Sequence, residues 1–416
     1  MMHPSAQWRW PCRAMVAIAA LSLLFGCQAP PGKPEPPVGP PAVETALKRL
    51  EPDTYPDFAD DMDYEGLERA LTHSIAYLQA APPERTFRFG PDPYDTAHVL
   101  KSLQHFLAFI RTQPPVRTLQ EFIRSDFRVY QSIGRDAQGQ VLFTGYYEPL
   151  LKGSLERRSE FSYPVYPRPD DLVTIDLGAF FEKYKGETIA GRLAGRRVVP
   201  YYDRREIEQD GVLSGKAEPI AWVEDPLDLF FLHIQGSGRI ALEDGRILHV
   251  GYDAKNGRPY RSIGQLLIDE GRIPRDEISM QRIKAYLREN PSEAERVLHH
   301  NPSFIFFRVV PDGPLGALNF TLTPGRSLAL DLKMFPPAAL AFTETMKPVG
   351  DAFGRVQAWT PCRRFVLNQD TGGAITGPGR ADIFWGSGPY AELAAGHLKH
   401  AGTLYFIVLK PEAASP

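Results

Sequence analysis

The sequence predicts a mainly β fold with helices, divided into two domains behind an N-terminal targeting segment. Apolar runs of strand length recur after residue 300, and few helical patterns interrupt them. Between residues 150 and 300 prolines and turn signals become denser, which indicates a second, inserted domain. With 416 residues, 43% of them hydrophobic and 23% charged, the chain can bury the cores of two to three globular domains.

The first 26 residues are typical of a signal peptide. Arg9 and Arg13 precede an apolar run at residues 14–24, which is too short to span a bilayer comfortably. The run ends in Leu-Phe-Gly-Cys, which resembles a bacterial lipobox, so Cys27 is predicted to be acylated and to begin the mature chain. An uncleaved anchor and a signal peptide without lipidation are the alternatives.

A lipidated, proline-rich tether is predicted over residues 27–43. Half of the residues from 28 to 41 are proline, and this composition keeps a chain extended and semi-rigid. Gln28 follows the cysteine, whereas an aspartate there would resemble an inner-membrane retention signal. The predicted location is therefore the periplasmic face of the outer membrane, where the lipid anchor holds the protein.

The globular part is expected to begin with helices. Apolar residues recur at helical spacing over residues 67–78 and 99–110, and the second run follows a plausible N-terminal cap at Asp95. Thr118 and Glu121 have the spacing of a capping box, which predicts a third, shorter helix.

The first domain is expected to comprise residues 44–150 and 301–416 and to contain most of the strands. Many short strands with few helices near the C-terminus suggest a closed barrel. The predicted strands lie at residues 127–131, 140–147, 303–310, 323–331, 338–345, 364–369 and 403–409.

The inserted domain is expected to comprise residues 151–300 and to consist mostly of short strands mixed with small helices. Residues 232–238 are predicted to form a strand that runs into a glycine turn. Two further capping boxes, at residues 262–265 and 292–295, predict two of the helices.

Composition excludes several classes of function. The formal net charge is −3 with no basic block, which argues against a nucleic-acid partner. No Walker A loop, His-Glu-x-x-His or paired Cys-x-x-Cys occurs, so neither a cofactor nor a metal is expected. His397 and His400 are assigned to the surface.

After processing, Cys362 would be the sole unmodified cysteine. It is predicted to be a buried hydrophobe without a disulfide partner.

Two aspartates, Asp370 and Asp382, lie on either side of glycine-rich turns within residues 368–388. Each carboxylate adjoins a short apolar segment of strand character, and the glycines let the backbone double back. This layout can bring two acids together in a partly dry cleft. Burial and a like-charge neighbour both raise the pKa of a carboxyl group, and a proton retained at neutral pH makes a general acid.

The residues alone leave two other interpretations of this segment open. Glycine and aspartate favour turns, so a pair of turns with solvated aspartates is the simplest alternative. Asp370-Thr371-Gly372 also has the form of an aspartic-protease triplet, whose chemistry needs two triplets that share one proton. A single triplet of this kind occurs in the sequence, so that chemistry would require a homodimer.

Four segments together resemble the motifs of the MltA-type membrane-bound lytic murein transglycosylases. Residues 370–388 match an Asp-x-Gly-Gly-Ala-Ile pattern followed by a glycine turn and a second aspartate. Residues 143–149, 231–238 and 301–307 resemble three further motifs of the family, in the family's order. The combination spans roughly residues 95–410 and is far more specific than any one of the four.

The resemblance implies a double-psi β-barrel catalytic domain, with the inserted domain as the other wall of a substrate groove. It implies cleavage of the β-1,4 bond between N-acetylmuramic acid and N-acetylglucosamine in peptidoglycan, for cell-wall turnover. The C6 hydroxyl of the muramoyl sugar attacks C1, so the product is a 1,6-anhydro sugar and one carboxyl group can serve as acid and then as base. A hydrolase that uses water and a non-catalytic peptidoglycan-binding lipoprotein remain alternatives.

The match to the family motif makes Asp382 the expected acid/base and Asp370 a nearby anion. That anion would raise the pKa of Asp382 and stabilise positive charge on the sugar. Aromatic and hydrogen-bonding side chains suit a sugar with hydroxyl and acetamido groups. The expected partners are glycan strands of peptidoglycan, the outer membrane, and cell-wall synthesis or division complexes. The predicted substrate-binding residues are Thr144, Gly145, Tyr146, Glu148, Gln235, Ser237 and Gly372.

Overall fold

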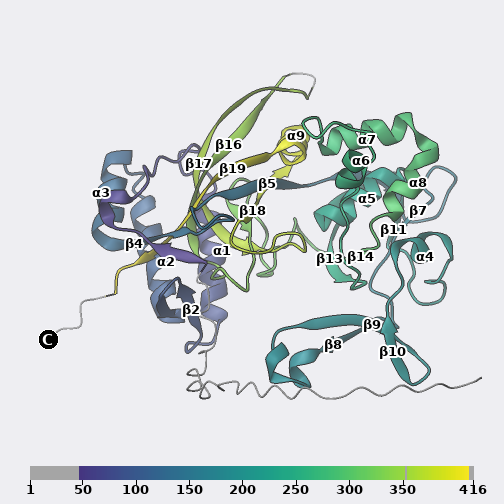
Figure 1. Ribbon diagram of the computed structural model, residues 1–416, viewed down its shortest axis with the longest axis horizontal. Coiled ribbons are helices and arrows are strands. Elements are labelled where there is room, and N and C mark those ends of the chain that lie inside the picture. Colours follow the sequence, from purple (N-terminus) through teal and green to yellow (C-terminus); the bar gives the residue numbers. More distant parts are fainter. Residues whose placement is uncertain (1–45, 352–353, 412–416) are drawn as a thin grey trace, which may run out of the picture. The chain divides into compact units, whose positions relative to one another are not determined.

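The computed structural model describes residues 46–351 and 354–411 (Figure 1). The predicted signal peptide and the whole of the predicted tether, residues 27–43 with Cys27, lie outside these residues. None of the helices in the described ranges has both the length and the apolar composition to cross a membrane. The α-helices are α1 Leu67–Ala80, α2 Thr96–Ile110, α3 Val116–Asp126, α4 Arg204–Gln209, α5 Pro226–Gln235, α6 Ile263–Asp269, α7 Met280–Glu289, α8 Pro291–His299 and α9 Pro389–His397. The 3-10 helices are η1 Pro52–Thr54, η2 Leu177–Ala179 and η3 Glu182–Tyr184.

Eight strands form the larger sheet, in the order β1-β4-β19-β16-β17-β15-β18-β5. A further pairing of β19 with β5 closes six of these strands into a barrel. The β15–β17 and β18–β5 pairs are parallel. The fold class predicted from the sequence, mainly β with helices around a closed barrel, is confirmed. The strand bounds are β1 Leu47–Arg49, β4 Phe127–Ser132, β5 Val141–Glu148, β15 Ser327–Ala329, β16 Leu340–Gly350, β17 Val356–Asp370, β18 Arg380–Ser387 and β19 Lys399–Leu409.

The N-terminal helices cover part of the barrel, as the apolar stripes predict. α1 packs against α2 and β17, and α2 packs against β19. Leu71 of α1 and Leu103 of α2 are buried in the same hydrophobic core as Phe143 and Phe365 of the barrel strands. The predicted cap of α2 is present, because the Asp95 carboxylate accepts a hydrogen bond from the backbone N of His98 at 2.7 Å.

Residues 232–238, predicted as a strand, instead form the end of helix α5, its C-terminal turn and the start of β12. α5 begins after Asp225, whose side chain accepts a hydrogen bond from the backbone N of Leu227 at 2.7 Å, and it ends at Gly236 with a φ of 78°. Its consecutive residues 229–233 are all buried. A helix that is buried on several sides has no 3.6-residue period, so its sequence resembles that of a buried strand.

Of the three predicted capping boxes, two are absent and one is half formed, although each predicted helix exists. Ser262 does cap α6, since its hydroxyl accepts a hydrogen bond from the backbone N of Gln265 at 3.1 Å. α3 follows Pro115 at its N-cap, and α8 has Pro291 at its first position. Proline fixes φ near the helical value, so both helices begin before the predicted caps.

A second sheet has six strands, in the order β14-β13-β12-β6-β11-β7. β14, predicted as part of the first domain, pairs with β13 in this sheet, so the chain returns to the barrel only after it. The proposed domain boundaries at residues 150/151 and 300/301 remain predictions. The bounds are β6 Leu150–Ser154, β7 Tyr163–Val165, β11 Ala221–Val223, β12 Ser237–Leu242, β13 Ile247–Lys255 and β14 Ile305–Val309.

Two smaller sheets complete the strand inventory of the described residues. One has three strands in the order β10-β9-β8, and the other is the hairpin β2–β3 beside the N-terminal helices. Their strands are β8 Val173–Asp176, β9 Thr188–Ala194, β10 Arg197–Pro200, β2 Thr86–Phe89 and β3 Asp92–Asp95.

A buried ion pair anchors the start of β15. Two guanidinium nitrogens of Arg326 donate to the Asp60 carboxylate at 2.6 and 2.8 Å, and both side chains are almost fully buried. Arg326 also donates to the backbone oxygens of Glu65 and Phe365. Buried charges are stable only when they are paired and hydrogen-bonded. This network therefore fixes the short strand Ser327–Ala329 between β17 and β18.

Candidate active site

Asp370 and Asp382 lie on either side of one residue of β15. Ala329 is the register partner of Asp370 on β17 and of Asp382 on β18. Adjacent strands are about 4.8 Å apart, so the two aspartate Cα atoms are separated by about two strand spacings, or roughly 10 Å. Ile383 is buried in the barrel core, and the alternation of a strand therefore turns Asp382 to the outer face. Both aspartate side chains are half-buried.

The two carboxylates have different hydrogen-bond partners. Asp370 accepts from the Tyr146 hydroxyl at 2.7 Å through Oδ2 and from the backbone N of Ala317 at 3.0 Å through Oδ1. Asp382 accepts from the Thr144 hydroxyl at 2.7 Å through Oδ1. In the described part of the chain, Oδ2 of Asp382 accepts no hydrogen bond. One oxygen of Asp382 is therefore free to carry a proton toward a ligand.

Burial raises the pKa of Asp370 to about 6, although the hydrogen bonds from Tyr146 and from the backbone N of Ala317 lower it. Burial likewise raises the pKa of Asp382 to about 6. The Thr144 hydrogen bond and the charge of Arg380 lower that pKa, and the charge of Asp370 raises it. Two neighbouring carboxyl groups that each have a pKa of about 6 favour a state in which one is protonated and the other is ionised. The donors around Asp370 stabilise its anion, so the proton favours Asp382.

An apolar floor lies beneath the acids. Tyr146, Leu322, Ala329 and Phe384 form one buried cluster, and the rings of Tyr146 and Phe384 have centroids 5.2 Å apart. Burial and the charge of Asp370 raise the pKa of the Tyr146 hydroxyl well above its ordinary value. Tyr146 therefore remains a hydrogen-bond donor, and the dry floor accounts for the raised pKa of both aspartates.

Arg380 lies at the edge of the pair, two residues before Asp382. Its guanidinium Nη2 donates to the Thr144 hydroxyl at 3.3 Å, and that hydroxyl donates in turn to Asp382. Arginine, hydroxyl and carboxylate thus form a chain that orients Thr144 toward the acid.

Gly145 follows Thr144, and its lack of a side chain has a packing reason. A Cβ built on Gly145 would lie 2.5 Å from the indole Nε1 of Trp385 and 3.0 Å from the Cα of Ala395. No residue other than glycine fits this contact between β5, β18 and α9 without displacement.

Glu148, predicted to bind substrate, lies at the end of β5 with its side chain buried. Its carboxylate is 3.2 Å from the Arg239 guanidinium and 3.6 Å from Nδ1 of His249, which belong to β12 and β13. Burial raises the pKa of Glu148, and the charges of Arg239 and His249 lower it. The structure therefore places Glu148 in an ion-pair cluster that joins the barrel to the second sheet.

The remaining predicted residues make no direct contact with either aspartate in the described structure. The side-chain oxygen of Gln235, at the end of α5, accepts a hydrogen bond from the backbone N of Tyr147 at 2.9 Å. Ser237 is buried at the start of β12, opposite Gly251 of β13. Gly372 lies in the loop after Asp370, where a Cβ would meet the side chain of Ile375 at 3.0 Å.

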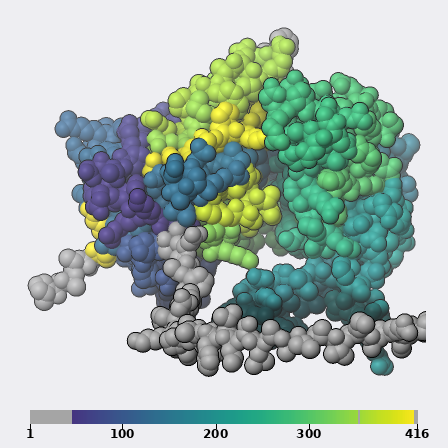
Figure 2. Space-filling view, in the orientation of Figure 1, coloured from purple at the N-terminus to yellow at the C-terminus, as the bar shows by residue number. Residues whose placement is uncertain are grey.

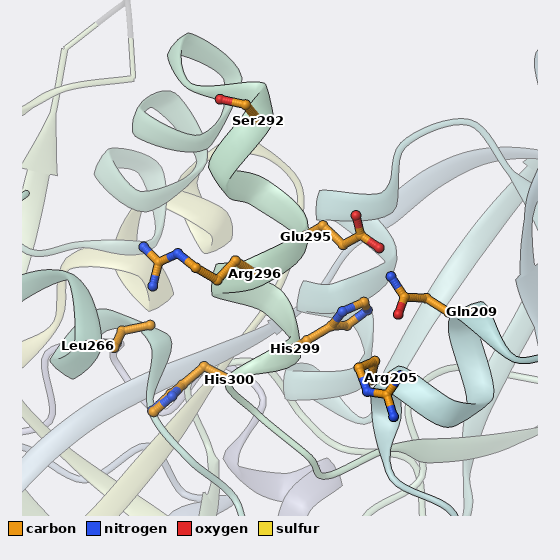
Figure 3. A pocket seen from close by; sticks show the side chains of 8 residues that line it. All are labelled: Arg205, Gln209, Leu266, Ser292, Glu295, Arg296, His299 and His300. Carbon is orange, nitrogen blue, oxygen red and sulfur yellow. The ribbon is translucent and has the colours of Figure 1, made fainter.

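A cavity of about 500 Å³ lies elsewhere, lined by residues of α4, α6 and α8 (Figure 3). Arg296 and His300 lie on one side of α8, and Glu295 and His299 lie on the other. Arg296 is already paired with Glu270 at 2.7 and 2.8 Å. The cavity lining includes neither aspartate. Among the residues that the structure describes, no group of three or more His, Cys, Asp or Glu side chains is arranged to hold a metal.

Three residues of the site have no signal in the sequence. Ala329 lies between the aspartates, Arg380 reaches Thr144, and Lys399 of β19 is the register partner of Thr144. Asp370, Ala329, Asp382, Thr144 and Lys399 thus lie in one row across five adjacent strands. Strand register decides this row, and local composition does not reveal register.

Comparisons with known proteins identify the family that this chain resembles. Family models match residues 142–308 as the MltA specific insert domain and residues 326–408 as the 3D domain. The membrane-bound lytic murein transglycosylase A of Escherichia coli (strain K12) is 34% identical over 288 residues, which cover 68% of this chain and 70% of that protein. The protein of the same name from Vibrio cholerae is 32% identical over 282 residues, which cover 67% and 68%.

Solved structures show the same fold. The membrane-bound lytic murein transglycosylase from Agrobacterium tumefaciens superposes with a TM-score of 0.71 at 29% identity, over 88% of this chain and 98% of that chain. Escherichia coli MltA with bound chitohexaose gives a TM-score of 0.67 at 26% identity, over 88% and 96%. The resemblance and the enzyme class predicted from the sequence are thereby confirmed. The chain belongs to the MltA family of membrane-bound lytic murein transglycosylases.

Proposed function

We propose that this protein cleaves the β-1,4 bond between N-acetylmuramic acid and N-acetylglucosamine in peptidoglycan, with a 1,6-anhydromuramoyl sugar as product. The observation that carries the proposal is the pair of outward-facing carboxyl groups on either side of Ala329, each with its pKa raised to about 6. The family relationship supports peptidoglycan as substrate, and the chitohexaose bound to the Escherichia coli relative supports a glycan-strand ligand.

Asp382 is the proposed acid and base, and Asp370 is the proposed anion. Asp370 has two hydrogen-bond donors that favour its ionised form, whereas Asp382 has one and keeps a free oxygen. An ionised Asp370 raises the pKa of Asp382 and stabilises positive charge that develops at the sugar C1 atom.

The reaction proceeds in two proton transfers. Asp382 donates its proton to the glycosidic oxygen, the C1–O bond breaks, and N-acetylglucosamine leaves with that proton. The C6 hydroxyl of the same muramoyl sugar then attacks C1 and closes the 1,6-anhydro ring. Its proton passes to the Asp382 carboxylate, which regenerates the acid. Because the nucleophile is part of the substrate, the reaction gains the benefit of proximity and consumes no water.

The substrate groove is proposed to lie between the barrel face and the inserted domain at residues 151–300. Its proposed binding residues are Thr144, Gly145, Tyr146, Glu148, Gln235, Ser237 and Gly372. Thr144 and Tyr146 have the strongest support, since each donates a hydrogen bond to one of the two acids. Gly145 has a further structural role beneath Trp385.

The protein is proposed to be attached to the periplasmic face of the outer membrane through an acylated Cys27, with residues 28–43 as the tether. The names of the curated relatives, which describe membrane-bound enzymes, support membrane attachment. Cell-wall synthesis or division complexes are its proposed protein partners.

Product analysis tests the proposal. The chain from Gln28 onward, which carries no acyl group, would be incubated with purified peptidoglycan, and the released muropeptides would be analysed by mass spectrometry. We expect products one water lighter than the corresponding hydrolytic products. Reducing-end products would instead establish a hydrolase, and binding without release would establish a non-catalytic module.

A further inference from the structure

The three-stranded sheet β8–β10 presents an apolar face to solvent. Ile189 and Leu193 of β9 and Val198 of β10 are 49%, 65% and 46% exposed. Ile189 pairs with Ile175 and Leu193 pairs with Val198, so these side chains share one face of the sheet. Residues 173–200 (teal) form part of the surface in the space-filling view (Figure 2).

The opposite face of the same sheet packs on the protein. The Arg192 guanidinium lies over the Tyr202 ring, 4.2 Å from its centroid, and Ala190 packs against the small core around Tyr201. A Cβ on Gly257 would lie 2.9 Å from the Cβ of Ala190, which shows how closely the two segments approach. Ala190 and Arg192 therefore face the protein, whereas the apolar side chains of Ile189, Leu193 and Val198 face solvent. This is the reverse of the usual arrangement of a one-sided sheet.

Aromatic side chains extend the apolar face at one end of the sheet. Phe180 and Phe181, between η2 and η3, are 69% and 60% exposed, and Tyr184 is 36% exposed. Exposed large apolar side chains gathered within residues 180–198 indicate an interaction surface rather than ordinary surface scatter. We call these residues the apolar arm; its members are Phe180, Phe181, Tyr184, Ile189, Leu193 and Val198.

Basic side chains lie at both ends of the apolar arm. Lys183 and Lys185 accompany the aromatic residues, and Arg196 lies in the β9–β10 turn. Arg197 begins β10 and, as the partner of Ala194, lies on the face opposite to Val198. All four are exposed. Residues 173–200 contain five basic and three acidic residues, whereas the whole chain has a net charge of −3. Apolar side chains bordered by lysine and arginine suit the interface of an anionic bilayer.

We propose that the apolar arm is a second membrane contact, which inserts its aromatic and aliphatic side chains into a surface of anionic phospholipid. The proposal goes beyond the catalytic function and is consistent with the proposed lipid anchor, because a short tether would keep the arm within reach of the bilayer. A sixteen-residue extended tether spans at most about 50 Å. The arm would then fix the orientation of the body on the membrane, which a tether alone leaves free.

Vesicle binding tests the proposal. The chain from Gln28 onward, which has no acyl group, would be sedimented with vesicles of phosphatidylethanolamine and phosphatidylglycerol, and separately with phosphatidylcholine vesicles. We expect binding to the anionic vesicles that falls at least about tenfold in the Phe180→Ser/Phe181→Ser double variant. Lys183→Glu/Lys185→Glu should weaken binding to anionic vesicles only, and more so at low salt.

A matched control is Leu155→Ser, which removes a side chain that is 50% exposed outside the arm and should leave vesicle binding unchanged. Neither Phe180 nor Phe181 is among the proposed substrate-binding residues, so turnover of solubilised glycan strands should be unchanged in the double variant. A failure of the arm and a failure of the active site are therefore distinguishable. Equal vesicle binding by the double variant and the unmodified chain would overturn the proposal. So would concentration-dependent dimerisation, or binding to vesicle-free peptidoglycan, that the double variant abolishes.

Discussion

The hydroxyl of Tyr146 distinguishes the two aspartates of the site. It donates to Asp370 and not to Asp382, and it thereby lowers the pKa of Asp370 that burial raises. In Tyr146→Phe we expect the pKa of Asp370 to rise, so that less of it is ionised near neutral pH. We predict that kcat at pH 6 falls about tenfold and that the acidic limb of the pH–rate profile moves to higher pH.

Measuring the pH dependence of kcat/KM for the unmodified protein and for Tyr146→Phe tests this prediction. Tyr147→Phe is the matched control, because Tyr147 is also a buried tyrosine of β5 but belongs to a different cluster of the core. If Tyr146→Phe lowered kcat without any change in the profile, Tyr146 would not act through Asp370.

Folding stability provides a second test at the residue scale. The folded-state pKa of Asp382, about 6, lies above the ordinary value near 3.9, so the folded protein favours the protonated form. The contribution of Asp382 to the free energy of unfolding is therefore fully present below pH 4 and is lost as the pH rises through 6. Asp382→Asn keeps the acceptor for Thr144 and removes the charge.

We therefore expect Asp382→Asn to exceed the unmodified protein in free energy of unfolding by about 1–2 kcal/mol at pH 8 and by little at pH 4. Urea denaturation at the two pH values measures the difference. A difference that did not change with pH would mean that Asp382 has an ordinary pKa.

At the scale of the elements, β15 is the strand that brings the acids together. It has three residues, yet it is parallel to β17 and antiparallel to β18, and Ala329 pairs with an aspartate on each side. The Asp60–Arg326 pair precedes it. Burial would raise the pKa of Asp60, but the hydrogen bonds and charge of Arg326 hold that pKa below its usual value.

Asp60→Asn should destabilise the protein by about 3–5 kcal/mol at pH 7, because it leaves the buried guanidinium of Arg326 without a carboxylate. Since the folded pKa of Asp60 is lowered, its contribution is present at neutral pH and is lost as the pH falls toward and below that pKa. Chemical denaturation measures the cost, with Asp253→Asn on the exposed side of β13 as control. A cost below 1 kcal/mol would show that the pair does not anchor β15.

The sequence predicted the helices and strands better than it predicted which strands pair. Apolar runs predicted β5, the C-terminal part of β17 and the middle of β18, and the stripes of α1 and α2 predicted those helices. Each of these signals depends on local spacing. The partners of β14 and the row from Asp370 to Lys399 depend on register, which tertiary packing decides. The two aspartates were found through a motif, whereas Ala329 between them has no local signature.

For the whole molecule, the proposed location depends on one residue outside the described structure. Cys27→Ser removes the proposed acylation site and should reduce the share of the protein in the membrane fraction or block its maturation. Fractionation with labelled fatty acid measures both effects. Cys12→Ser, within the predicted signal peptide, should leave labelling and location unchanged. Unchanged labelling of the Cys27→Ser protein would contradict the lipid anchor.

The most direct test of the central claim compares the Asp382→Asn and Asp370→Asn variants in the release of 1,6-anhydro muropeptides from peptidoglycan. In the proposed mechanism Asp382 transfers the proton in both steps, so we predict that Asp382→Asn loses about 10³-fold in kcat. Asp370→Asn should lose about 10²-fold, because it removes only electrostatic stabilisation. An active Asp382→Asn variant beside an inactive Asp370→Asn variant would contradict the assignment and make Asp370 the acid.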